Sequence, residues 1–160
     1  MRLWRITTRK WALDKRCDGA RLYGGRWNPP GSPVVYASES RALAVLEVFV
    51  HLTAEARAMS FVLLSIEMPT RARVTRQEGE RPRRSLGVSQ EIGRRWLDEG
   101  DTLAIVVPSV IVPQDANYVL NVRHPQFAGL VAKHEPFSFD ERLWKRRMVA
   151  REGGSGSSSG

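Results

Sequence analysis

The chain has 160 residues, of which 42% are hydrophobic, and carries a formal net charge of +8. This length suits one domain with a buried core, and a second domain is not expected. No apolar run is long enough to span a bilayer and no signal peptide opens the chain, so we expect a cytoplasmic protein without membrane contact. Cys17 is the only cysteine, which excludes an internal disulfide and a cysteine-based zinc cluster.

The positive charge comes mainly from arginine and is compatible with three kinds of surface. A basic surface can serve solubility alone, bind a nucleic acid, or attract an anionic ligand and an acidic partner protein. The arginines are spread from Arg2 to Arg151 and are not interleaved with aromatic residues of the kind that stack on bases. We therefore favour solubility and an anionic ligand over a nucleic acid.

Hydrophobic and β-branched runs alternate with Gly-, Pro- and charge-rich segments along the chain. They predict strands at residues 3–6, 34–38, 60–69, 102–108, 110–113, 118–120 and 129–132, with a fragment around residue 74. The continuous apolar run 102–108 is typical of a central strand buried on both faces. Residues 8–23 show no clear period. The pattern alone indicates an α+β protein with many short strands.

Two helices are expected. The first covers residues 39–55 and is capped by Ser38 or Ser40, because either hydroxyl can accept from the unpaired amides of the first turn. The second covers residues 90–97, with Ser89 as its cap and Gly100 at its end. We expect its Ile92, Trp96 and Leu97 to face inward.

The single domain is expected to cover residues 1–150. Residues 151–160 are dominated by Gly and Ser and cannot bury apolar area, so they are interpreted as a disordered tail or a linker. Cys17 has no helix start or histidine nearby to activate it, and we expect no function for its thiol. The three histidines are spaced too irregularly to indicate a metal site.

One stretch of the chain places a loop, a strand and a helix in close succession. Residues 24–31 read Gly-Gly-Arg-Trp-Asn-Pro-Pro-Gly and must form a turn-rich loop with special backbone angles. The strand 34–38 and the first helix follow with almost no spare residues. One pocket is therefore expected to gather Arg26, Tyr36 and Glu47.

Glu47 lies among apolar helix residues, which leaves it almost no polar face. A carboxylate there must be buried or lie at the floor of a cleft, and burying it unpaired costs several kcal/mol. A structural ion pair with Arg26 or another arginine is one interpretation, since such networks also bury charges. The other interpretation is a chemical site.

The residue types favour cleavage at an anomeric carbon. An N-glycosidic bond breaks through an oxocarbenium-like transition state, which a carboxylate such as Glu47 stabilises. The planar fork of Arg26 suits a pyrophosphate or a ribose oxygen, and the ring of Tyr36 offers a face to a flat cationic base. The substrate that fits all three is NAD.

Several motifs, in this order, resemble the RES domain family. They are Gly24-Gly25-Arg26-Trp27-Asn28-x-x-Gly31, Val34-Val35-Tyr36-x-Ser38, the helix with Ala42, Ala44 and Glu47, Val107-Pro108-Ser109, Asn117-Tyr118-x-Leu120-Asn121-x-x-His124-Pro125-x-Phe127, and Phe137-x-Phe139-Asp140-x-Arg142-Leu143. The resemblance covers roughly residues 3–144. Val122-Arg123 departs from it, where a proline and a small residue are expected.

The resemblance implies a bacterial toxin with an ADP-ribosyltransferase-like fold, here a split, mostly antiparallel sheet with flanking helices. It carries the family's arginine, glutamate and serine onto Arg26, Glu47 and Ser109, and a tyrosine onto Tyr36. It implies that NAD is a substrate and not a cofactor, and is broken by hydrolysis or phosphorolysis. It also implies an Xre-type antitoxin that occludes the active site, with DNA contacted only through that antitoxin.

Three further residues are candidates for substrate binding. Ser109 follows a proline at the end of a predicted strand, and we expect it to position substrate by a hydrogen bond. Tyr23 flanks the glycine pair and is expected at the pocket mouth, and Asn121 is a further candidate. Two alternatives remain open: an ADP-ribosyltransferase that modifies a protein, and a non-enzymatic nucleic-acid-binding module.

Overall fold

The computed structural model describes residues 1–9, 18–77 and 85–144. Seven strands form one sheet in the order β4-β5-β6-β2-β1-β3-β7. The strands are β1 (Arg2–Thr8), β2 (Val34–Ser38), β3 (Phe61–Glu67), β4 (Val74–Arg76), β5 (Ala104–Pro108), β6 (Ala116–Asn121) and β7 (Val131–Phe137). The helices are α2 (Asp18–Tyr23), α3 (Arg41–Phe49) and α4 (Leu86–Glu99), with 3₁₀ turns η1 (Ala54–Ala58) and η2 (Pro125–Gly129). The α+β class and the single domain are confirmed.

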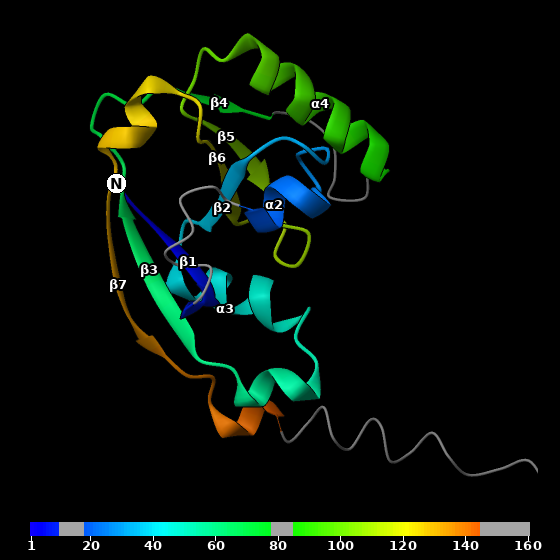
Figure 1. The fold of residues 1–160 in the computed structure, drawn as a ribbon, viewed down its shortest axis with the longest axis vertical. Helices are drawn as coiled ribbons and strands as arrows, with labels where there is room; N and C mark the ends of the chain where they lie inside the picture. The colour runs from blue at the N-terminus through cyan, green and yellow to red at the C-terminus, as the bar shows by residue number, and fades with distance from the viewer. Residues whose placement is uncertain (10–17, 78–84, 145–160) are drawn as a thin grey trace, which may run out of the picture.

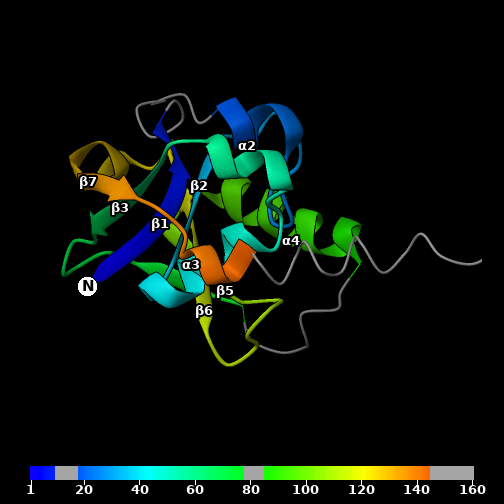
Figure 2. The same ribbon diagram turned by 90° about the horizontal axis from the view of Figure 1, so that it is seen from below.

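The sheet is nearly divided between β1 and β2. These two strands share one paired position, Trp4 with Ser38, whereas β1 pairs with β3 along its whole length. The guanidinium of Arg5 bridges the division by donating to the carbonyl oxygen of Tyr36 at 2.9 Å. All strand pairs are antiparallel except β4 with β5, so the expected split, mostly antiparallel sheet is confirmed. Figures 1 and 2 show β7 and α4 on opposite sides of the molecule.

The strand β5 is buried on both faces, as its continuous apolar sequence predicts. Ala104 and Val106 belong to one hydrophobic cluster, while Ile105 and Val107 belong to another on the opposite face. The third cluster contains Ile6, Ala44, Phe61, Phe139 and Trp144, and its aromatic rings make edge contacts. This cluster lies against α3 and holds that helix over β1.

The strand expected at residues 110–113 does not form. The side-chain oxygen of Ser109 accepts from the backbone amides of Ile111 and Val112, both at 3.0 Å, and closes a turn there. A serine can offer the backbone this alternative to a sheet ladder. Apolar residues thus line a loop here, and the prediction from hydrophobicity alone was wrong.

The helix α3 begins at Arg41, two residues after the start expected at residue 39, and ends earlier than expected. Ser40 caps it by accepting from the amide of Leu43 at 3.1 Å. After Phe49 the amides of His51 and Leu52 bond three residues back instead of four, which tightens the chain and ends the helix. Residues 50–55 are therefore not part of the helix, contrary to the prediction.

The helix α4 is longer than predicted. Ser85 is its cap, with its hydroxyl accepting from the amide of Val88. Ser89, the expected cap, lies inside the helix and is fully buried. Gly100 ends the helix in the left-handed conformation, with φ 67°, as predicted. Trp96 is buried and Ile92 and Leu97 are half-buried, which confirms the inward face.

Other elements complete the comparison with the sequence. The helix α2 lies in a segment without a clear period, and the sequence pattern does not predict it. The fragment around residue 74 is β4, and β7 begins two residues after the start expected at residue 129. Cys17 and residues 151–160 lie outside the described residues. In the described part of the chain, no helix has the length and apolar character needed to cross a membrane.

Candidate active site

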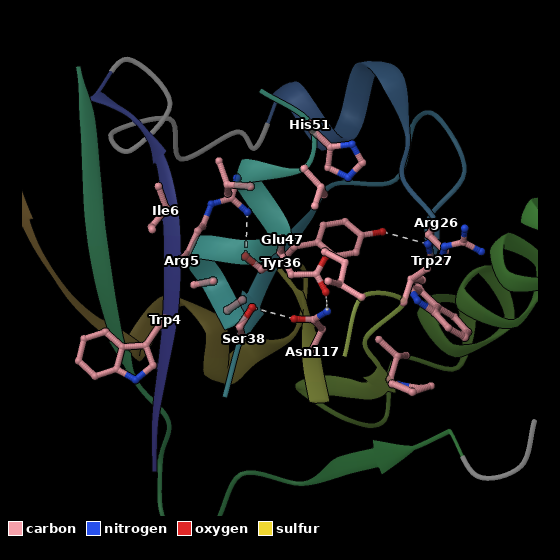
Figure 3. A pocket seen from close by; sticks show the side chains of 18 residues that line it. Trp4, Arg5, Ile6, Arg26, Trp27, Tyr36, Ser38, Glu47, His51 and Asn117 are labelled. Carbon is pink, nitrogen blue, oxygen red and sulfur yellow. Dashed lines mark hydrogen bonds between the residues drawn. The ribbon is translucent and has the colours of Figure 1, made fainter. Parts of the chain in front are cut away.

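A pocket of about 490 Å³ lies where the sheet divides (Figure 3). The strand β1 contributes Trp4, Arg5 and Ile6 to its lining, and β2 contributes Tyr36, Ala37 and Ser38. The rest of the lining comes from the 24–31 loop, α3 and the turn after it, the end of β5 and the turn after it, and the start of β6. These residues are Arg26, Trp27, Ala44, Glu47, Val48, Val50, His51, Val107, Pro108, Val110, Ile111 and Asn117. The weak pairing of β1 with β2 thus leaves room for a ligand beside α3.

Glu47 projects from α3 into this pocket and is half-buried. Its Oε1 accepts from the hydroxyl of Ser109 at 2.8 Å and from the side-chain amide of Asn117. Both donors are neutral and both bonds end on the same oxygen. This arrangement fixes the carboxylate through Oε1, and Oε2 takes part in neither of these two hydrogen bonds.

Ser109 lies behind Glu47 and is fully buried. Its hydroxyl donates to Glu47 and accepts from the two backbone amides of the turn, which polarises the O–H toward the carboxylate. Ser109 is absent from the pocket lining. The geometry therefore gives Ser109 contact with Glu47, whereas the sequence led us to expect contact with substrate.

Asn117 is a site residue that the sequence analysis did not single out. Its position opposite Ser38 in the β2–β6 ladder lets the Ser38 hydroxyl donate to its Oδ1 at 2.7 Å. That bond turns the amide nitrogen toward Glu47. Its signal in the sequence is the Asn-Tyr-x-Leu-Asn motif, but nothing there shows which asparagine faces the pocket.

The 24–31 loop is locked by a buried asparagine. Asn28 is 0% exposed, and its amide nitrogen donates to the carbonyls of Ala20 and Ser32, each at 2.9 Å. Its Oδ1 accepts from the hydroxyl of Tyr36 at 2.7 Å. Gly24 has φ 68°, a conformation that favours glycine, as the sequence predicts for this loop. Arg26 is thereby presented from a rigid turn.

Tyr36 joins the strand β2 to this loop. Its hydroxyl also accepts from the amide of Trp27 at 3.0 Å. Burial raises the pKa of the Tyr36 phenol to about 12, against the opposing effects of the Trp27 amide and the charges of Arg26 and Arg5. The phenol therefore stays neutral near pH 7, and its ring remains available to line the pocket.

The pocket brings together Arg26, Tyr36 and Glu47, as expected from the sequence. It does not include Tyr23, which is 81% exposed, or Asn121. Asn121 pairs with Val34, at the end of β6 far from Asn117, and its side chain accepts from the amide of Arg123. The lining residues Trp4, Arg5 and His51 were missed because β1 and the turn after α3 carry no local motif.

The pocket combines two arginines and a histidine with one fixed carboxylate. Arg5 and Arg26 suit an anionic group, and the carboxylate suits a centre on which positive charge develops. Among residues 1–9, 18–77 and 85–144, no group of three or more His, Cys, Asp or Glu residues is placed to hold a metal ion. The fold and the site define an α+β protein with a carboxylate-bearing pocket at the division of its sheet.

The chain belongs to the RES domain family, whose model matches residues 2–140. The "Prs ADP-ribosylating toxin" of Sphingobium sp. (strain YBL2) is 34% identical over 89% of this chain and 96% of its own length. "Toxin Res" of Yersinia enterocolitica is 33% identical over 89% of this chain and 99% of its own length. "Toxin Res" of Pseudomonas putida is 36% identical over 90% of this chain and its full length.

A solved structure shares the fold. It is a chain in the crystal structure of the M. tuberculosis MbcT–MbcA toxin–antitoxin complex, with a TM-score of 0.69 and 17% identity, covering 91% of this chain and 87% of that chain. The expectation of a RES-family protein is therefore confirmed by the family model and by the curated relatives.

Proposed function

We propose that this protein is the toxin of a toxin–antitoxin pair, and that it acts in the cytoplasm by cleaving the bond between nicotinamide and ribose in NAD. The observation that carries the proposal is the carboxylate of Glu47, held on one oxygen by Ser109 and Asn117 inside a pocket that also contains two arginines. Membership of a family whose curated members are named toxins supports the biological role.

The pocket residues fit the charges of the reaction. When the bond between C1″ of the ribose and the nicotinamide nitrogen breaks, its electron pair goes to that nitrogen, and positive charge develops on the ribose as an oxocarbenium ion. Oε2 of Glu47 stabilises that charge, and removing such a group costs about 10²–10³-fold in rate. Arg26 and Arg5 are suited to hold the pyrophosphate, and the ring of Tyr36 offers a face to the nicotinamide.

The acceptor completes the reaction and decides its product. Its oxygen or nitrogen forms the new bond to C1″ and releases a proton to solvent. Water gives ADP-ribose, inorganic phosphate gives ADP-ribose 1″-phosphate, and a protein side chain gives an ADP-ribosylated protein. Transfer to a protein is the second candidate function, and the relative named an ADP-ribosylating toxin favours it.

Nicotinamide release tests the proposal whichever acceptor is used, because every acceptor leaves nicotinamide as a product. The purified protein is incubated with NAD in buffer, in buffer with phosphate, and with cell lysate plus labelled NAD, and products are separated by chromatography. We expect nicotinamide in at least one arm, and the accompanying ADP-ribose, ADP-ribose 1″-phosphate or labelled protein identifies the acceptor. A folded protein that releases no nicotinamide in any arm would contradict the proposal.

A partner protein is expected to control this activity. The structural neighbour comes from a toxin–antitoxin complex, and NAD cleavage in the host cytoplasm must be restrained. We propose an antitoxin of the Xre type that places a carboxylate-bearing segment near Arg26 and so competes with NAD. The net charge of +8 would steer such a segment to the pocket.

A further inference from the structure

The helix α4 contacts both residues that flank Arg26, although it contributes nothing to the pocket lining. The side-chain amide of Gln90 donates to the carbonyl oxygen of Gly25 at 2.9 Å. One turn further along the helix, Gly93 lies directly against the carbonyl of Trp27. Figure 1 shows α4 as an outer layer of the molecule, beside β4 and β5.

The contact at Gly93 tolerates no side chain. A Cβ atom added to Gly93 would lie 1.7 Å from the oxygen and 2.6 Å from the carbonyl carbon of Trp27. Both partners are main chain, so neither can rotate away as the end of a flexible side chain would. Glycine is unfavourable inside a helix, and the close approach of the loop supplies a reason for its presence here.

The two peptide units on either side of Arg26 are held by side chains from two different elements, α4 and β2. Gln90 holds the carbonyl of the peptide that precedes Arg26, and the hydroxyl of Tyr36 holds the amide of the peptide that follows it. These two bonds together restrict the backbone angles of Arg26. The direction in which its guanidinium leaves the loop is therefore set jointly by β2 and α4.

The helix itself is fixed to the sheet, so it can act as a rigid support. Trp96 is buried in one cluster with Trp27, Ile105 and Val107, and its indole nitrogen donates to Thr102 at 2.9 Å. Ile92 and Leu97 pack against the same cluster. A shift of α4 would therefore move the Trp27 end of the pocket.

We propose that Gln90 and Gly93 are positioning residues, which hold Arg26 in the orientation that binds the anionic part of the substrate. This inference rests on the proposed function, because it assigns Arg26 a role in binding NAD. Neither residue touches the pocket, and both act through the main chain of the loop. A displacement of this kind can cost up to about 10²-fold in catalytic efficiency.

The test compares Gln90→Met, Gly93→Ala and Gly87→Ala by nicotinamide release over a range of NAD concentrations. Gln90→Met keeps the length of the side chain but removes the donor. Gly87→Ala is the matched control, because Gly87 lies in the same helix and a Cβ there meets nothing within 4 Å. We expect KM to rise by about 10-fold in Gln90→Met and Gly93→Ala and to stay unchanged in Gly87→Ala.

KM separates a positioning role from a merely structural one. Partial unfolding lowers the maximal rate in proportion to the folded fraction but leaves the KM of the folded molecules unchanged. Arg26→Ala and the double variant Arg26→Ala with Gln90→Met complete a double-mutant cycle. We expect that adding Gln90→Met to Arg26→Ala does not change KM any further. If Gly93→Ala does not fold, this cycle decides alone.

The outcomes distinguish the two proposals. Normal turnover in Arg26→Ala would overturn the proposed function of this pocket, and with it the inference. A defective Arg26→Ala together with unchanged KM in Gln90→Met would overturn the positioning role alone. The positioning role would also be overturned if Gln90→Met raised KM equally in the wild-type protein and in Arg26→Ala. Gln90 would then affect KM without acting through Arg26.

Discussion

At the scale of single residues, the chemistry depends on how Glu47 is held. Ser109 and Asn117 both donate to Glu47, and Ser38 in turn donates to Asn117. These bonds form one chain from the turn after β5, through the carboxylate, to Ser38 in β2. Because these three side chains are neutral, the chain fixes the carboxylate without neutralising it. The charge of Glu47 thus remains available to a cationic transition state.

Removing Asn117 should therefore impair the reaction more than the fold. We expect Asn117→Ala to lower nicotinamide release by about 10- to 100-fold, because the carboxylate loses one of its two donors and its fixed orientation. Gln114→Ala, which removes an exposed amide in the preceding loop, serves as the control. Equal rates for the two folded variants would show that Asn117 does not position Glu47.

Tyr36 gives a prediction that concerns stability at alkaline pH. The folded protein has a Tyr36 pKa of about 12 against the ordinary tyrosine value of 10.0, so between these values it binds more protons than the unfolded chain. Stability must then fall as the pH rises from 10 to 12. A pKa raised by this much corresponds to a loss of stability on the order of 3 kcal/mol.

The variant Tyr36→Phe isolates this contribution. Near pH 7 it should be less stable than the wild type by about 1–3 kcal/mol, because Asn28 and the Trp27 amide lose a partner. Urea unfolding at pH 7 and near pH 11 measures the free energy of unfolding of both proteins. The difference in this free energy between the wild type and Tyr36→Phe should be smaller at the higher pH. A constant difference in stability would mean that the Tyr36 phenol titrates normally, and a widening difference would mean that its pKa is lowered; either result would contradict the raised pKa.

At the scale of elements, α3 carries Glu47, and its start is set by Ser40. Ser40→Ala should lower the free energy of unfolding by about 1 kcal/mol, because the amide of Leu43 loses its acceptor. Thr53 occupies the same cap position of η1 but makes no side-chain cap bond, so Thr53→Ala is the control and should change little. Urea unfolding measures the free energy of unfolding of both variants. An equal loss in Ser40→Ala and Thr53→Ala would refute the capping role of Ser40.

The sequence predicts elements well where local pattern and burial agree. The strand β2 has the bounds that its sequence predicts, and β5 is predictable because both of its faces are buried. Prediction fails where a side chain overrides local hydrophobicity, as Ser109 does in turning the chain after β5. It also fails for α2, whose sequence has no clear period, and for the cap of α4, where two serines, Ser85 and Ser89, compete within five residues.

The site is predictable in part for the same reason. Arg26, Tyr36 and Glu47 lie on consecutive elements, so a local motif brings them to one pocket. Trp4 and Asn117 reach it only through the order of strands in the sheet, and Gly93 reaches the loop only through the packing of α4. Such contacts join distant parts of the chain, and no local pattern records them.

At the scale of the whole molecule, the net charge of +8 bears on control by a partner. If an antitoxin enters the pocket near Arg26, then NAD and antitoxin should compete, and the toxin–antitoxin complex should weaken as salt screens the attraction. Calorimetric titration at low and high salt, with and without NAD, measures both effects. A tight complex that still consumes NAD at the full rate would contradict occlusion.

The most direct test of the central claim compares nicotinamide release by the wild-type protein and by Glu47→Gln. This substitution keeps the size of the side chain but removes its negative charge. The account predicts release by the wild type and a loss of about 10²–10³-fold or more in Glu47→Gln, with both proteins folded by circular dichroism. Near-normal release by a folded Glu47→Gln protein would contradict the role assigned to this carboxylate.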